Sequence, residues 1–236
     1  MEDTYNVKAI ILNRRALGES DGRVTAYSRE AGKLELTVRG MKKPKSKLAA
    51  HLEPLNLTNI MVVRGQKHDY VGAAMSENCY PEIKNDLAKL AAAGRALKIT
   101  GELIKPGLAD ERIFELLKDY LLTLEASKNG LEVLAPFFVF KLLAELGHQP
   151  ELFSCLACSK KISPGKNKFD LAKGGLVCDR CAKPGDSNQL VISDDGIKLL
   201  RLALKTDFKQ LAKVKVGGKL CGEAGGVIDK FSKYCF

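Results

Sequence analysis

The stretch VKAIILNRRALGESDGRVTAYSREAGKLELTVRG, residues 7–40, decides the fold expected for the first part of this chain. It holds three short runs rich in β-branched and other apolar residues, at 7–15, 23–30 and 33–40. Turn residues separate the runs, with Gly18 and Asp21–Gly22 after the first and Gly32 after the second. Because β-branched residues favour strands and glycine favours turns, the stretch predicts three consecutive strands.

Two further runs of the same kind follow, at 55–65 and 70–77. Five short strands within the first 78 residues suit a small closed barrel. The OB-fold is the best-known five-stranded barrel of this kind, and its surface binds single-stranded nucleic acid. An SH3-like barrel is the competing interpretation of the same strands.

After Pro81 the apolar residues repeat at spacings of three and four, which is typical of helices. The first expected helix carries the apolar set Ile83, Leu87, Leu90 and Leu97. Further helices are expected after Asp110, over about 132–146, and from Asp194 to about Lys213, whereas the glycine-rich tail gives no clear pattern. The chain is therefore predicted to be α+β, with a five-stranded barrel domain over 1–79, for which the OB-fold is the first candidate, and a helical domain over 80–236.

A four-cysteine unit, CLACSKKISPGKNKFDLAKGGLVCDRC at 155–181, interrupts the helical part. Its C-x2-C-x19-C-x2-C spacing is that of a structural zinc site formed by Cys155, Cys158, Cys178 and Cys181. Two thiolates in a tight turn can hold one ion, and a second such turn completes a tetrahedron without an open position for catalysis. We therefore expect one structural Zn²⁺ in an insertion at about 150–185. Iron–sulfur ligation is the rival interpretation.

Positive charge is unevenly distributed along the chain, whose formal net charge is +10. Residues 1–80 have 13 Lys/Arg against 9 Asp/Glu, whereas residues 81–150 have 9 against 10. Residues 151–185 have 7 against 3, and residues 186–236 have 9 against 6. A basic surface gains affinity for a polyanion by releasing counterions from its phosphates, so a nucleic-acid partner is expected.

The densest basic segment is RGMKKPKSKLAAH at 39–51, which contains no acid and the five cations Arg39, Lys42, Lys43, Lys45 and Lys47. Pro44 and Ser46 indicate a loop. Like charges at this density repel one another, which favours phosphate binding over the alternative of a solvated loop. Three arginines border the turn between the first two expected strands and complete the candidate phosphate contacts: Arg14, Arg15 and Arg23.

Several function classes lack their sequence signature here. There is no Walker A loop, no dinucleotide-binding fingerprint and no HExxH motif, so the chain is not expected to be an enzyme. No apolar run approaches the roughly 20 residues needed to span a bilayer. The N-terminus lacks the features of a signal peptide, so a cytoplasmic protein without a membrane contact is expected.

Two segments together resemble the RecO family of bacterial DNA repair and recombination mediators. The first is AIILNRRALGESDGRVTAYSREAGKLELTVRGMKKPKSKLAAHLEPLN, with its Gly-Glu-Ser-Asp turn, Gly-Lys hairpin and Lys-Pro-Lys-Ser loop. The second is FVFKLLAELGHQPELFSCLAC, a leucine-rich helix leading through Gly and Pro into the first cysteine pair. The resemblance covers residues 6 to 205. It implies an OB domain followed by a helical domain with an inserted zinc module.

The resemblance also implies a function without turnover. Members bind single- and double-stranded DNA, anneal complementary strands and act with RecR to load the recombinase, RecA, on DNA coated by single-strand-binding protein, whose C-terminal tail they bind. Carried over, the eight basic residues named above would contact DNA and the four cysteines would bind the metal. An RNA- or ribosome-associated binding protein is the alternative, and a metal-dependent nuclease is a third, disfavoured hypothesis.

Overall fold

The computed structural model describes residues 3–128 and 130–235. Five strands come first, and helices and a small second sheet follow, so the predicted α+β class with a five-stranded N-terminal sheet is confirmed. Tertiary contacts divide the chain into two compact units, Met1–Ala126 and Ser127–Phe236. No helix among the described residues is long and apolar enough to cross a membrane.

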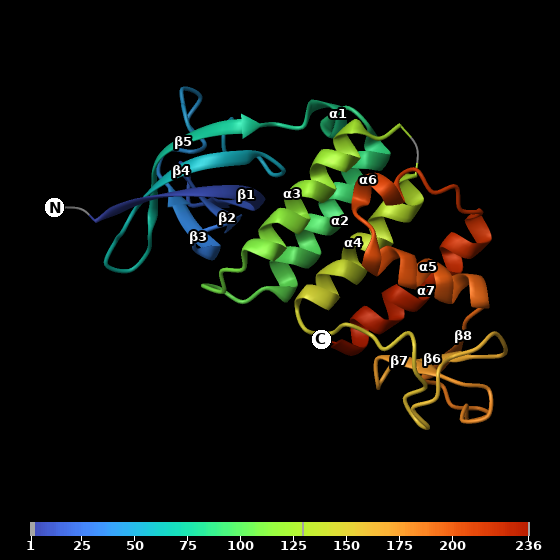
Figure 1. Cartoon of the computed structure of the whole chain (residues 1–236). Helices are drawn as coiled ribbons and strands as arrows, with labels where there is room; N and C mark the ends of the chain where they lie inside the picture. Colours follow the sequence, from blue (N-terminus) through green and yellow to red (C-terminus); the bar gives the residue numbers. More distant parts are fainter. Residues whose placement is uncertain (1–2, 129, 236) are drawn as a thin grey trace. The chain divides into compact units, whose positions relative to one another are not determined.

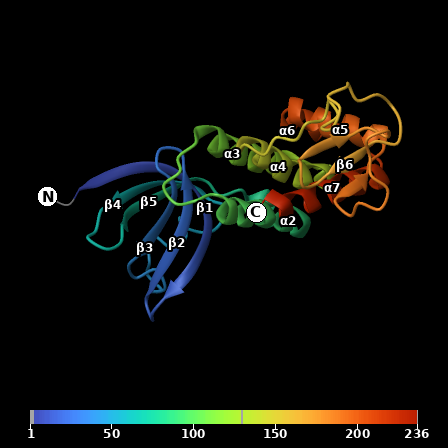
Figure 2. The same cartoon turned by 90° about the horizontal axis from the view of Figure 1, so that it is seen from below.

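The N-terminal sheet is formed by β1 (Thr4–Leu17), β2 (Asp21–Ser28), β3 (Gly32–Val38), β4 (Leu57–Val63) and β5 (Tyr70–Asn78). The strands are hydrogen-bonded in the closed order β1-β2-β3-β5-β4, and β4 returns to β1 (Figure 2). The long strand β1 serves both neighbours, because its first half pairs with β4 and its second half with β2. A register shift between Ile11 and Asn13 lies where β1 passes beyond its pairing with β4.

Alternation along the strands gives the sheet its core. Val7, Ala9 and Ile11 are buried on β1, and alternate residues of the other four strands join them in one apolar cluster. Met41 and Leu52 from the long β3–β4 loop belong to the same cluster. The basic loop is therefore anchored at both ends by buried apolar side chains while its lysines remain exposed.

Three helices complete the first unit: α1 (Pro81–Lys84), α2 (Leu87–Leu103) and α3 (Glu111–Ala126) (Figure 1). The expected apolar face of α2 is partly wrong, because Leu87 is 85% exposed. The buried face instead contains Ala93, Ala96 and Leu97. Small side chains let this face approach its neighbours closely, and the leucine spacing did not reveal that choice.

The helices of this unit are tied to the strands by specific hydrogen bonds. Lys33 of β3 donates its Nζ to the Ile104 carbonyl at 3.0 Å, at the C-terminal end of α2. The Tyr27 hydroxyl of β2 donates to the Asp110 carbonyl at 3.2 Å, just before α3. A cation is favoured at a helix C-terminus because the last carbonyls lack partners within the helix.

The second unit contains α4 (Leu131–Glu145), α5 (Asp194–Lys205), α6 (Phe208–Leu211) and α7 (Gly218–Cys235). The prediction for α4 holds, with Pro136 inside its N-terminal half and Gly147 in the left-handed conformation just after its end. The expectation of one helix from Asp194 to about Lys213 is wrong, because the helix α5 ends at Lys205. Thr206 is extended there, and the Asp207 side chain accepts a hydrogen bond from the Gln210 N–H to begin α6.

The glycine-rich tail forms a full helix, which the sequence pattern left undecided. Cys221, Ala224, Val227, Ile228 and Phe231 are buried at helical spacing. The helix α7 packs against α4, where a side chain at Gly225 would lie 3.7 Å from Pro136. Burial of this face outweighs the helix-breaking tendency of glycine, which is about 1 kcal/mol per residue.

A three-stranded antiparallel sheet lies between α4 and α5 in the sequence, in the order β7-β6-β8. It consists of β6 (Lys168–Asp170), β7 (Gly175–Val177) and β8 (Gln189–Val191). Figure 1 shows it at one end of α5 and α7. The buried ring of Phe169 packs edge-on against Phe231 of α7 at 5.4 Å between centroids, which anchors the small sheet on the helices.

Candidate metal centre and basic surface

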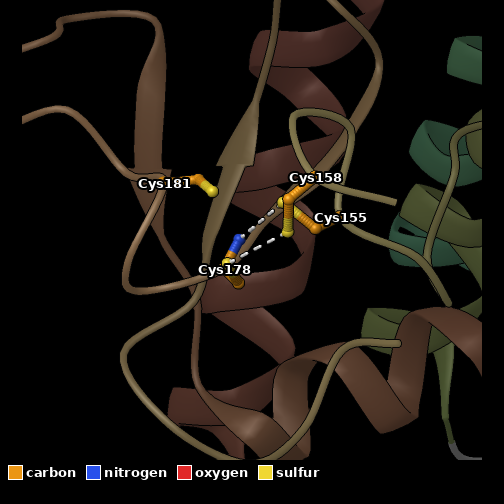
Figure 3. Close-up of side chains that lie close together, drawn as sticks. All are labelled: Cys155, Cys158, Cys178 and Cys181. Carbon is orange, nitrogen blue, oxygen red and sulfur yellow. Dashed lines mark hydrogen bonds between the residues drawn. The ribbon is translucent and has the colours of Figure 1, made fainter. Parts of the chain in front are cut away.

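The four predicted cysteine ligands converge on one point. The sulfur atoms of Cys155, Cys158, Cys178 and Cys181 all lie within 4.8 Å of one another (Figure 3). The Cys158 and Cys178 sulfurs are 3.9 Å apart. A tetrahedral zinc ion with Zn–S distances of about 2.3 Å places its sulfurs about 3.8 Å apart, so the cluster matches that size.

Two backbone turns and the small sheet position these sulfurs. The first pair lies in a turn in which the Ser159 N–H donates to the Cys155 carbonyl at 2.8 Å. The second pair begins directly after β7, and the Ala182 N–H donates to the Cys178 carbonyl at 2.9 Å. Because the Leu156 N–H also donates to the Leu176 carbonyl at 2.9 Å, the first turn is fixed to the strand that leads into the second.

The electrostatics of the cluster favour a bound cation. Burial opposes ionisation of Cys155, but the backbone N–H groups of Cys178, Ala157 and Cys158 outweigh it and lower the pKa of the thiol to about 6. Neighbouring sulfurs act in the opposite direction on Cys181, where hydrogen bonds with Cys178 and Cys158 raise the pKa to about 12. Four thiolates without a metal repel one another, whereas a divalent cation stabilises all four.

A four-sulfur donor set fits a structural metal ion. The cluster can hold Zn²⁺ with all four positions filled, which leaves no site for a water nucleophile. Such an ion would join the two turns of a module that has only three short strands. The same sulfur set also suits iron, so its chemistry alone does not choose between the two metals.

The basic loop forms a second concentration of charge, in the first unit. A hollow of about 330 Å³ is lined by Arg39, Gly40, Lys43, Lys45, Ser46, Lys47 and Leu48. Lys43, Lys45 and Lys47 are exposed, and no carboxylate of the described residues lies within 4.0 Å of their amino groups. The structure thus brings four of the eight predicted DNA contacts around one hollow and leaves three lysines available to an anion.

The other predicted basic residues divide into two groups. Arg14 donates to the Ala49 carbonyl at 3.1 Å and lies 3.9 Å from Glu53, so it is held beside the loop. Lys42, within the loop, donates to the Gly18 carbonyl at 3.5 Å. Arg15 and Arg23 are paired across β1 and β2 and share Glu35, at 3.8 and 3.6 Å. These two arginines are partly neutralised, which makes them weaker candidates than the loop lysines.

Sequence reasoning missed Tyr70 as a member of this surface. The Arg39 guanidinium lies 4.4 Å from the centre of the Tyr70 ring, on the first residue of β5. A cation above an aromatic ring is held in place without losing its charge. The parallel pairing of Thr37 with Tyr70 creates this contact, and pairing between distant strands leaves no local signal in the sequence.

Fold and site together define an α+β protein with a four-thiol cluster that can hold a metal ion and a basic surface on its N-terminal sheet. Two family models cover almost the whole chain: Recombination protein O N terminal over residues 1–76 and Recombination protein O C terminal over residues 84–234. The chain therefore belongs to the RecO family, and this membership supports a role in DNA repair and recombination.

Curated relatives agree with this assignment. The chain is 27% identical to DNA repair protein RecO of Desulforamulus reducens, over 98% of this chain and 89% of that protein. It is 28% identical to the protein of the same name from Dehalococcoides mccartyi, over 93% of this chain and 85% of the relative. A third, from a Thermoanaerobacter species, is 26% identical over 96% of this chain and 90% of its own length. The predicted family is thus confirmed.

Proposed function

We propose that this protein is a recombination mediator that binds single- and double-stranded DNA and anneals complementary strands without turnover. The observation that carries the proposal is the hollow of the basic loop, with three exposed lysines that have no acidic partner among the described residues. Membership in a DNA repair family makes phosphate the fitting anion. Arg14, Arg15 and Arg23 would extend the contact along the neighbouring strands.

The metal is proposed to be one structural Zn²⁺ held by the four cysteines. The closed sulfur set supports a role in folding rather than in hydrolysis, in line with a protein that is not an enzyme. The division into a DNA-binding domain over 1–79 and a helical domain over 80–236 is part of the same proposal. It assigns the oligonucleotide contact of the basic loop to the strand domain.

The partners proposed are RecR, the C-terminal tail of single-strand-binding protein, and the recombinase RecA. With RecR, the protein would help RecA replace single-strand-binding protein on DNA. The site of action would be the cytoplasm, at the nucleoid. These partners follow from the family and from the proposed DNA-binding role.

The decisive experiment is annealing of two complementary oligonucleotides that are first coated with single-strand-binding protein, without nucleotide. We expect this protein to accelerate duplex formation. If the protein binds bare DNA but does not accelerate annealing of the coated oligonucleotides, the mediator role is contradicted. Tighter binding of RNA than of DNA of the same sequence would instead support an RNA-associated function, and loss of oligonucleotide length would indicate a nuclease.

A further inference from the structure

An exposed aromatic ring lies beside two cations in the C-terminal unit, outside the sites described above. Phe153 is 46% exposed, although it is a large apolar side chain. The Arg201 guanidinium lies 4.8 Å from the centre of its ring and the Lys205 amino group 5.2 Å. Both cations come from α5, whereas Phe153 stands two residues before Cys155. Segments far apart in sequence thus form one small surface.

The Phe153 backbone and the Arg201 guanidinium are both held by hydrogen bonds within the protein. The Phe153 N–H donates to Glu151 Oε1 at 2.7 Å, and the Phe153 carbonyl accepts from the Ile162 N–H at 2.8 Å. Arg201 donates its Nε to the Leu152 carbonyl at 2.9 Å. A ligand that binds here therefore meets an Arg201 side chain that is already held in place, which favours affinity.

The charge of this surface is largely uncompensated. Among the described residues, no carboxylate lies within 4.0 Å of the charged nitrogens of Arg201 or Lys205. The pKa of Glu151 is lowered chiefly by the hydrogen bonds that its carboxylate accepts from the backbone N–H groups of Phe153 and Ser154. The charge of Arg201 lowers this pKa only in addition. Lys198, one turn earlier on α5, is by contrast paired with Asp195 at 2.9 Å.

We propose that Phe153, Arg201 and Lys205 form a second contact site for single-stranded DNA. A base stacks on the exposed part of the Phe153 ring, and the two cations contact the neighbouring phosphates. Single strands are the fitting partner because their base faces are accessible, whereas a duplex buries them. This inference rests on the proposed DNA-binding function and gives the C-terminal unit a DNA contact of its own.

The test uses the full metal-loaded chain and two labelled oligomers of equal length, one of thymidines and one of abasic sites. Phe153→Leu keeps an apolar side chain but removes the ring. We expect it to weaken binding of the thymidine oligomer about 5- to 100-fold, since each base–aromatic stack contributes on that order. Binding of the abasic oligomer should stay unchanged, and Phe153→Tyr should bind both as the wild type does.

Charge variants on the same helix separate stacking from phosphate contact. Lys205→Gln should weaken binding of both oligomers and reduce the slope of log affinity against log salt by about 0.7, the loss of one phosphate contact. Lys198→Gln, whose lysine is already paired with Asp195, is the matched control and should leave that slope unchanged. An unfolded variant would lose both oligomers, so the ratio between the two oligomers reports stacking even if stability falls.

The outcomes separate this inference from the proposed function. If Phe153→Leu binds thymidine oligomers like the wild type while alanines at Lys43, Lys45 and Lys47 abolish binding, the second site is wrong and the first stands. If the wild type binds neither oligomer, the proposed function fails and this inference fails with it. If Phe153→Leu and Lys205→Gln lose binding to a polyglutamate peptide but keep the oligonucleotide affinity of the wild type, the surface binds an acidic protein instead, and the DNA site is wrong.

Discussion

At Cys155, backbone N–H groups from both halves of the metal cluster stabilise a single sulfur. The Cys178 N–H lies 3.4 Å from the Cys155 sulfur, although the two residues are 23 positions apart. The folded turns therefore lower the pKa of the Cys155 thiol and favour its thiolate form. The spacing of the cysteines identified all four ligands, whereas the folded structure alone shows that Cys155 is buried and Cys158, in the same turn, is exposed.

We predict that Cys155→Ser with Cys158→Ser abolishes metal binding, because two sulfurs cannot complete the tetrahedron. Metal content should fall from one equivalent to nearly zero, and the melting temperature should fall, since metal binding contributes to folding. Elemental analysis and calorimetry check both. Cys79→Ser, at an exposed cysteine outside the cluster, is the control and should keep the metal. Full metal content in the double variant would disprove the ligand assignment.

Asp110 is a second residue whose role is local. Its carboxylate accepts a hydrogen bond from the Arg112 N–H at 2.9 Å at the start of α3. The Arg112 side chain lowers the pKa of Asp110 most, with backbone hydrogen bonds adding to the effect. A lowered folded-state pKa means that the stabilisation is complete above the ordinary aspartate pKa of about 4 and is lost as pH falls through the folded value.

Asp110→Ala should therefore lower the free energy of unfolding by about 1 kcal/mol at pH 7, the usual loss for an N-terminal cap. The difference from the wild type should shrink as the pH is lowered below about 4. Urea unfolding at a series of pH values measures it. Asp110→Asn, which can still accept the hydrogen bond, should retain much of the stability at pH 7. A difference that grows toward acidic pH would contradict this assignment.

At the scale of the element, α7 shows how packing overrides propensity. Its sequence holds Gly218, Gly222, Gly225 and Gly226, and the pattern alone did not indicate a helix. The helix forms because its apolar side chains are buried against α4 and α5. The break between α5 and α6 is the reverse case, since the run of leucines continued past the point where Asp207 begins a new helix.

Gly222→Ala should stabilise the protein, because a methyl group at this position meets no atom within 4 Å and the backbone is already helical. The expected gain in the free energy of unfolding is about 0.5–1 kcal/mol. Chemical unfolding measures it. Gly130→Ala is the contrasting variant, because Gly130 has a φ of +82° and a methyl group there would lie 3.0 Å from the Ala212 carbonyl oxygen. Gly130→Ala should lower the free energy of unfolding. A higher free energy of unfolding for Gly130→Ala together with a lower one for Gly222→Ala would refute the packing described for α7.

At the scale of the whole molecule, lysines that are paired with carboxylates differ from lysines that are available to bind an anion. The net charge of +10 is not spread evenly, and Lys8, Lys98 and Lys118 of the first unit are already paired with carboxylates. Lys43, Lys45 and Lys47 of the basic loop are different, because apolar anchors fix the ends of the loop while no carboxylate among the described residues pairs with these three. Counting charges along the sequence found the loop but could not show which cations lack a partner.

We predict that alanines at Lys43, Lys45 and Lys47 weaken binding to oligonucleotides of any sequence and reduce the slope of log affinity against log salt by about 2 on single strands. Fluorescence anisotropy at several salt concentrations measures the slope. The matched control places alanine at Lys8, Lys98 and Lys118, which removes the same charge from the protein. These three lysines are paired with Glu77, Glu102 and Glu115. Equal slopes for the two variants would show that total charge, rather than the loop, determines binding.

The sequence by itself determined the α+β class, the five strands, the position of the loop and the four cysteines, because each depends on local periodicity or fixed spacing. Only the tertiary structure decided that Tyr70 supports Arg39, that Leu87 is exposed, that the glycine-rich tail is a helix, and that Phe153 lies beside Arg201 and Lys205. These features depend on contacts between residues distant in the chain. Such contacts are fixed by burial and strand pairing across the fold, which leave no local pattern.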